Sequence, residues 1–251
     1  ALSGYAKASA CQSQHVQPML TAAQCCAVEE FLRDFPKNEQ LVLPERLSKQ
    51  LLALAGFPVS VPVVAHTAMQ AADAAEAFGY PVALKVESYV IQHKTDVGGV
   101  RLGLQDRAAV KEAFLQMDSA MKRLDPSACV TVQPMAQSGF EVMLGAARLH
   151  DTPLMVAGMG GIYAEAFQDM AFRLAPLQEG QAERMLQSLR CAPVLNGFRT
   201  PPLDRAGVCQ LLQRLSELMQ AFAQIREVDL NPCRVYENGC AILDARIVLQ
   251  L

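Results

Sequence analysis

The sequence contains no tryptophan, and phenylalanine and tyrosine bring its aromatic content to only 6% of 251 residues. It also lacks any run approaching the roughly 18 consecutive apolar residues that a membrane-spanning helix requires. No apolar signal segment is visible among residues 1–10. Basic residues are not in excess, since 22 lysines and arginines face 25 aspartates and glutamates, so nothing indicates a nucleic-acid surface. These absences favour a cytoplasmic protein that binds neither nucleic acid nor membrane.

The eight cysteines lack the spacing of a metal site or of a disulfide scaffold. No Cys-x-x-Cys pair occurs, and none of the four histidines lies at ligand spacing from a cysteine. Several cysteines stand among apolar residues, as in the runs that begin at Cys129 and Cys240, where a reduced thiol behaves as a small apolar side chain. We therefore expect buried, reduced cysteines, which are typical of the cytoplasm.

Apolar residues are abundant, at 51% of the chain, and the formal net charge is only −3. A chain of this length can bury a sizeable core as one large domain or as two lobes. Strand patterns alternate with amphipathic helices, two of which begin after Asp106 and Asp204; this indicates an α/β or α+β fold. We expect residues 1–43 to form a helical and linker segment and residues 44–251 to form the main domain.

A lysine and a glycine-containing loop are the first candidates for a ligand site. Lys85 interrupts an apolar strand, so its ammonium either reaches solvent at a sheet edge or meets an anion. Downstream, a polar run begins at His93 and ends in Gly98 and Gly99. Glycines let the backbone point N–H groups at a phosphate, and a histidine ring nitrogen can accept a phosphoryl group. An ordinary turn explains these glycines, and those in the run 158–161, equally well.

The C-terminal segment predicts a β-hairpin with a two-residue turn at Asn238–Gly239. Continuing that register places Cys233 opposite Asp244. Because side chains alternate between the two faces of a strand, Asp229, Asn231, Cys233 and Asp244 then share one face. Carboxylate and amide oxygens that converge in this way are suitable ligands for Mg²⁺. A solvated polar face is the alternative, although apolar neighbours indicate that these strands are largely buried.

Eight motifs occur in an order that resembles the ATP-grasp domain of the NDP-forming acyl-CoA synthetases. This family includes ADP-forming acetate–CoA ligase and is related to the β subunit of succinyl-CoA synthetase. The resemblance covers approximately Leu43 to Leu251. The motifs are Pro81–Lys85, His93–Gly99, Gln133–Met135, Glu141–Gly145, Gly158–Gly161 with Glu165, Arg173–Leu177, Glu227–Pro232 and Asp244–Ile247.

The resemblance implies an ATP-grasp fold, in which a nucleotide (ATP or ADP) lies between two α+β lobes. It assigns Lys85 to the nucleotide phosphates and places a hinge at 133–135, against adenine. The implied nucleotide-binding residues are Lys85, Gly98, Gly99, Gln133, Met135, Glu141, Gly160 and Gly161. The implied Mg²⁺ ligands are Asn231 and Asp244, with Asp229 as a third.

The resemblance also implies an enzyme, an ADP-forming acid–CoA ligase that is incomplete without its CoA-binding part. In this family, acyl-CoA and phosphate give an acyl phosphate and then a phosphohistidine, whose phosphoryl group passes to ADP. The principal phosphohistidine belongs to a CoA-binding, α-type domain or subunit, with which we expect an oligomeric assembly. His93, Glu165 and Arg199 are the catalytic candidates on this chain, and His93 matches a family histidine that can itself accept the phosphoryl group.

Two loops depart from the family pattern. The run 150–154 lacks the usual Phe-Gly, and the motif at 197–200 keeps Arg199 but replaces its last glycine by threonine. The first forty residues are similar to the linker of fused synthetases, which predicts a C-terminal piece of a longer protein rather than a free β subunit. A regulatory ATP-grasp-like domain of a fused protein acetyltransferase is the alternative function, and a scaffold that binds only partner chains is a third.

Overall fold

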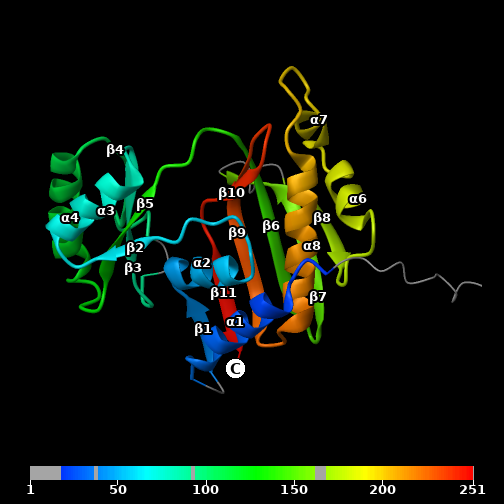
Figure 1. Cartoon of the computed structure of the whole chain (residues 1–251), viewed down its shortest axis with the longest axis horizontal. Helices are drawn as coiled ribbons and strands as arrows, with labels where there is room; N and C mark the ends of the chain where they lie inside the picture. The colour runs from blue at the N-terminus through cyan, green and yellow to red at the C-terminus, as the bar shows by residue number, and fades with distance from the viewer. Residues whose placement is uncertain (1–17, 37–38, 92–93, 162–167, 251) are drawn as a thin grey trace, which may run out of the picture.

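A computed structural model describes residues 18–36, 39–91, 94–161 and 168–250 of the chain. These residues form two lobes, each built on a sheet whose paired strands run antiparallel (Figure 1). The predicted arrangement of two α+β lobes is therefore confirmed. Within these ranges, no helix combines the length and the apolar character needed to cross a membrane.

The small lobe has a four-stranded sheet in the order β2-β5-β3-β4, packed against helices α3 and α4 (Figure 1). Thr67 and Asp106 begin the two helices, because their side chains accept the amide hydrogens of Gln70 and Ala109. The helix predicted after Asp106 is thereby confirmed. The elements are β2 (Val63–Ala65), α3 (Ala68–Phe78), β3 (Val82–Glu87), β4 (Val100–Leu104), α4 (Arg107–Met121) and β5 (Cys129–Pro134).

The large lobe has a seven-stranded sheet in the order β1-β11-β9-β6-β7-β8, with β10 paired to β9. Its apolar core includes buried side chains from α1, α2, α6 and α8. The helices are α1 (Ala22–Arg33), α2 (Glu45–Leu54), α6 (Gln181–Gln187), α7 (Ala192–Leu195) and α8 (Arg205–Ala221). The strands are β1 (Gln40–Leu43), β6 (Phe140–Leu149), β7 (Thr152–Met159), β8 (Met170–Leu174), β9 (Ile225–Val235), β10 (Cys240–Ile242) and β11 (Arg246–Gln250).

The expected linker ends earlier than residue 43. Strand β1 lies inside it and pairs with β11, so that Leu43 lies opposite Ile247 in the large sheet. Sequence reasoning missed this strand because its four residues follow a proline-containing polar stretch, where no alternation is long enough to be recognised. The large lobe therefore begins before the predicted boundary at residue 44.

The two lobes have separate apolar cores, and none of the buried residues in one core belongs to the other. Residues 135–139 connect β5 of the small sheet with β6 of the large sheet. This connection begins at Met135, the last residue of the segment 133–135 at which the resemblance predicts a hinge. The space between the lobes is where the candidate site lies.

The predicted register of the C-terminal hairpin is wrong by two residues. Ile242, rather than Asp244, lies opposite Cys233. The turn is centred on residues 237–238, because the amide of Tyr236 donates to the carbonyl of Gly239. Gly239 has a φ of +85°, as expected of the glycine that follows such a turn. Asp244 consequently lies in the segment between β10 and β11.

The predicted placement of Cys233 on the same face as Asp229 and Asn231 is also wrong, because β9 contains a bulge. Strand β6 pairs with β9 so that Val142 faces Cys233 and Leu144 faces Leu230, which leaves one extra residue in β9. Cys233 therefore turns into the core, where it is fully buried. Asp229 and Asn231 remain on the opposite face, because side chains alternate until the bulge interrupts the pattern. The bulge separates the thiol from the candidate metal ligands.

Candidate functional site

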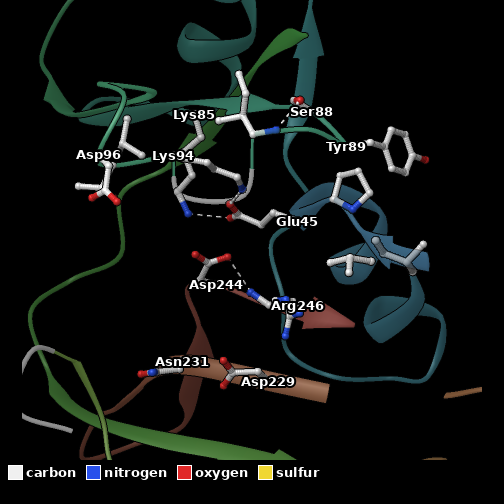
Figure 2. Close-up of a pocket in the computed structure, with 17 residues that line it drawn as sticks. Glu45, Lys85, Ser88, Tyr89, Lys94, Asp96, Asp229, Asn231, Asp244 and Arg246 are labelled. Atoms are coloured by element: carbon white, nitrogen blue, oxygen red, sulfur yellow. Dashed lines mark hydrogen bonds and ion pairs between the residues drawn. The ribbon is translucent and has the colours of Figure 1, made fainter. Parts of the chain in front are cut away.

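A charged cavity of about 640 Å³ lies between the two lobes. Four residues predicted for the site line it: Lys85, Asp229, Asn231 and Asp244. Figure 2 shows Lys85 and Lys94 directed toward the carboxylate of Glu45, with Asp244 facing this group and the two β9 residues beyond it. The two lysines come from the small lobe, and Arg246 on β11 of the large lobe is a third basic side chain. The acidic side chains that line the cavity are Asp96 of the small lobe and Glu45, Asp229 and Asp244 of the large lobe.

Glu45 is the main residue of this cavity that sequence reasoning missed. It is the first residue of α2 and only 6% exposed. Its Oε1 lies 2.7 Å from Nζ of Lys85 and 2.9 Å from Nζ of Lys49, and its Oε2 lies 2.9 Å from Nζ of Lys94. Burial opposes ionisation of the carboxyl, but the three ammonium groups outweigh it and hold the pKa of Glu45 far below its usual value. The only signal in the sequence is the i,i+4 spacing of Glu45 and Lys49, which predicts a helical ion pair and nothing more.

Lys85 lies on β3, between β5 and β4, so the interpretation as an edge lysine is wrong. Its side chain is 12% exposed and its ammonium pairs with Glu45. The alternative prediction, that this lysine meets an anion, is confirmed with an anion from the chain itself. Lys85 also lines a second cavity, described below, and so stands at the junction of both.

Asp244 lies on the acidic side of the charged cavity. Its Oδ1 accepts the amide hydrogen of Ala245 at 2.9 Å, which fixes the carboxylate against the backbone. Burial raises the pKa of Asp244, and the nearby carboxylate of Glu45 adds to this; Lys85 opposes both effects. A cation placed beside Asp244 would relieve this unfavourable environment.

Asp229 and Asn231 provide two further oxygens on β9. Burial raises the pKa of Asp229 to about 6, aided by the charges of Glu227 and Asp244. The side-chain oxygen of Asn231 accepts the amide hydrogen of Gly161 at 3.2 Å, which orients it at the end of β7.

These three side chains offer the oxygen ligands that a hard cation prefers. In the part of the chain that the structure describes, no three His, Cys, Asp or Glu side chains gather as a metal site. The candidate set, Asp229, Asn231 and Asp244, therefore depends on an amide oxygen as its third member.

A second cavity, of about 400 Å³, adjoins the connection between the lobes. Gln133 and Met135, both predicted to lie against adenine, line it together with Ile242 and Leu243. The carboxamide oxygen of Gln133 accepts a hydrogen bond of 2.9 Å from the buried ammonium of Lys49. Because its lining is largely apolar, this cavity suits a flat ring rather than a charged group.

Gly98 and Gly99 of the small lobe form hydrogen bonds within the turn that contains them. The amide of Gly98 donates to the carbonyl of Thr95 at 3.1 Å, and that of Gly99 donates to the carbonyl of Lys94 at 2.7 Å. A side chain at Gly99 would place its Cβ 2.4 Å from Val86 on β3. The interpretation in which these amides are free for a phosphate does not hold in this structure, and the ordinary turn accounts for both glycines.

The glycines after β7 pack against β6 and β9. The amide of Gly160 donates to the carbonyl of Glu141 at 2.9 Å, and a Cβ at Gly160 would lie 2.5 Å from the backbone of Val142. The carboxylate of Glu141 pairs with Arg234 at 3.0 Å and lies beside Gly161. Glu141, Gly160 and Gly161 thus gather next to Asn231 and line neither of the two cavities.

Of the three catalytic candidates, only Arg199 lies within the described ranges. His93 and Glu165 lie outside the described ranges. Arg199 lies in the exposed segment between α7 and α8, where its guanidinium stands 5.3 Å from the ring centre of Phe198. This segment lies at the end of the large lobe beyond α7 (Figure 1), and Arg199 lines neither cavity.

Comparison with known proteins gives consistent matches over most of the chain. The ATP-grasp domain family matches residues 34–249. The 4-hydroxybutyrate–CoA ligase [ADP-forming] of Nitrosopumilus maritimus is 36% identical over 85% of this chain, which spans only 32% of that protein. The subunit beta of acetate–CoA ligase [ADP-forming] I of Pyrococcus furiosus is 32% identical over 85% of this chain and 93% of its own length.

Solved structures agree with these matches. Two structures of the dinucleotide-forming acetyl-coenzyme A synthetase 1 of Ca. Korarchaeum cryptofilum are 32% and 29% identical to this chain, with TM-scores of 0.80 and 0.75. They cover 89% and 90% of this chain, which covers 98% and 100% of theirs. The family match over residues 34–249 includes strands of both sheets and the connection between them. The chain therefore belongs to the ATP-grasp domain family, in the branch found in ADP-forming acyl-CoA ligases.

Proposed function

We propose that this chain is the nucleotide-binding and phosphoryl-transfer part of an ADP-forming acyl-CoA ligase. The overall reaction is acyl-CoA + ADP + phosphate ⇌ carboxylic acid + CoA + ATP. The observation that carries the proposal is the position of Lys85 at the junction of an apolar cavity and a charged one, with Asp244 on the other side of the charged cavity. This is the arrangement that a nucleoside diphosphate requires.

In this proposal, the adenine ring occupies the apolar cavity beside Gln133 and Met135. The phosphates then extend past Lys85 into the charged cavity and meet the ammonium of Lys94. Positioning and charge neutralisation dominate catalysis of phosphoryl transfer, and two lysines supply both. Their ammonium groups hold the accepting phosphate of ADP in place without having to gain or lose a proton.

Asp229, Asn231 and Asp244 would hold Mg²⁺, which neutralises phosphate charge when bound. One K. cryptofilum structure is a complex with coenzyme A and Mg-AMPPCP, and this supports a magnesium nucleotide here. The raised pKa of Asp244 indicates that its carboxylate lacks a sufficient counter-charge within the chain. A divalent cation would provide it.

The phosphoryl group would come from a phosphohistidine on a CoA-binding partner. In that K. cryptofilum complex, a phosphohistidine segment points towards the nucleotide-binding site. The Pyrococcus furiosus relative of similar length is named as a subunit beta, and this supports a separate α-type partner. The chain spans about a third of the length of the 4-hydroxybutyrate ligase, so a fused chain is the other arrangement. His93 remains a candidate intermediate acceptor, and Glu165 and Arg199 remain catalytic candidates.

The decisive experiment combines the chain with its CoA-binding partner, acyl-CoA, ADP, phosphate and Mg²⁺, and measures ATP. We expect ATP formation that stops when Asp244→Asn replaces the wild-type chain. Calorimetry of Mg-ADP with the chain alone provides the simpler test. ADP binding without ATP formation would favour the regulatory alternative, and no binding at millimolar Mg-ADP would refute a nucleotide site.

A further inference from the structure

The two lobes are joined at helix α2 by charged side chains rather than by a shared apolar core. Leu51 and Leu52 of this helix belong to the core of the large lobe. Its first turn instead contacts the small lobe, through Glu45 to Lys85 at 2.7 Å and through Arg46 to Glu87 at 2.9 Å. Both ion pairs join α2 to β3. The first contains Lys85, which we propose binds the nucleotide phosphates, whereas neither residue of the second lines either cavity.

A third contact comes from Lys49, one helical turn further along α2. Its ammonium, in a side chain only 2% exposed, pairs with Glu45 and donates to Gln133 at 2.9 Å and to the carbonyl of Leu243 at 2.7 Å. Gln133 belongs to the small sheet, and Leu243 precedes Asp244 in the large lobe. Lys49 therefore fixes the position of the Glu45 carboxylate relative to both cavities.

We propose that Glu45 is a positioning residue of the phosphate site, which holds the ammonium groups of Lys85 and Lys94 together at the wall of the charged cavity. This inference rests on the proposed nucleotide function. It also assigns Lys94, which the sequence did not single out, as a second phosphate ligand. Glu45 acts through these two lysines and needs no contact with the nucleotide.

The geometry requires a carboxylate at this position. Three ammonium groups stand within 3 Å of its two oxygens, and like charges gathered so closely repel one another. A neutral amide at position 45 offers a single acceptor oxygen, and its NH₂ group faces the remaining cations. Lys85 and Lys94 are flexible side chains, 12% and 18% exposed, so without their common anion they would separate and turn toward solvent.

The test measures dissociation constants of Mg-ADP and of adenosine by calorimetry for the wild-type chain and for Glu45→Gln. We expect Glu45→Gln to weaken Mg-ADP binding about tenfold or more, which is typical of losing one charge-assisted contact. Adenosine, which has no phosphate, should bind within about threefold of wild type. A purely structural defect would weaken both ligands together.

Glu87→Gln is the matched control, because it removes a neighbouring carboxylate between α2 and β3 that pairs with Arg46 and lines neither cavity. We expect it to leave both dissociation constants unchanged. If Glu45→Gln does not fold, Lys94→Met takes its place, and a tenfold loss of Mg-ADP affinity alone is again expected.

Three outcomes would overturn the inference: unchanged or tighter Mg-ADP binding by Glu45→Gln, equal losses for the two ligands, or unchanged Mg-ADP binding by Lys94→Met. A wild-type chain that binds no Mg-ADP would instead refute the proposed function itself. The failure of one proposal can thus be told from the failure of the other.

Discussion

Lys49 and Lys85 both pair with Glu45. Substitution by methionine should mainly lower stability at the first and mainly weaken nucleotide binding at the second. Lys49→Met removes a buried ammonium that has three partners: Glu45, Gln133 and the carbonyl of Leu243. Lys85→Met removes an ammonium that lines both cavities and contacts Glu45 at 2.7 Å and the carbonyl of Leu243 at 3.5 Å, two acceptors that both keep Lys49 as a donor. The first lysine supports the structure, and the second is placed to bind nucleotide.

The magnitudes follow from the partners that each substitution leaves behind. Breaking a buried ion pair costs about 3–5 kcal/mol of unfolding free energy. Glu45 keeps two other lysines, which lowers that figure, but a buried acceptor on Gln133 and another on Leu243 lose a donor, at about 1–3 kcal/mol each. We expect Lys49→Met to lower the free energy of unfolding by about 4 kcal/mol. Lys85→Met should lower it by only about 1 kcal/mol, while weakening Mg-ADP binding at least about tenfold.

Urea denaturation of the nucleotide-free chains gives the two stabilities, and calorimetry with Mg-ADP gives the affinities. A Lys85→Met variant as unstable as Lys49→Met would contradict this reasoning. So would a Lys49→Met variant within about 1 kcal/mol of wild type, because the three contacts of that ammonium would then contribute little.

Three further outcomes are expected. Asp229 has a folded-state pKa of about 6, above its unfolded value of about 3.9, so its ionisation destabilises the metal-free fold as pH rises through that window. Asp229→Asn should therefore raise the unfolding free energy by about 2 kcal/mol at pH 8. Equal gains at pH 8 and pH 4 in urea titrations would refute the assignment. Gly160→Ala should destabilise the chain by about 2 kcal/mol in thermal unfolding, because its Cβ would meet the backbone of Val142 at 2.5 Å; an unchanged midpoint would contradict this contact. Among the described cysteines, exposed Cys26 should be alkylated first and buried Cys233 last, since burial raises the pKa of the Cys233 thiol, and mass spectrometry of timed samples would show the order.

Much of the local structure could be predicted because its causes lie within a few residues. The helix after Asp106 begins with a side-chain cap, and its apolar face at a period of 3.6 residues is buried as expected, from Val110 to Met121. Leu124 continues the same apolar spacing three residues after Met121, yet it lies beyond the helix and is 55% exposed. Periodicity identified the helix but could not locate its end.

The candidate metal ligands were identified by an argument that was partly wrong. The predicted register placed Asp244 opposite Cys233, whereas the turn shifts the pairing by two residues and a bulge turns Cys233 into the core. Asp229, Asn231 and Asp244 nevertheless line one cavity. They meet there because β10 and β11 pair with β9 in one register, with Ile242 opposite Cys233 and Arg246 opposite Asp229. The segment that contains Asp244 therefore runs alongside β9 at the level of Asn231.

The amino-acid sequence by itself indicated a fold of alternating strands and helices, the helices that begin after Asp106 and Asp204, and the ordered motifs that resemble those of the family. It also marked Lys85 as a residue that either reaches solvent at a sheet edge or meets an anion, because an unpaired ammonium is costly inside an apolar strand. The position of β3 between β5 and β4 excludes the edge. Only the tertiary structure decided which anion this is. Glu45 lies 40 residues away in sequence, and no periodicity connects a helix of one lobe with a strand of the other. Pairing between distant charges depends on how the two lobes pack together, and that packing is a property of the whole fold.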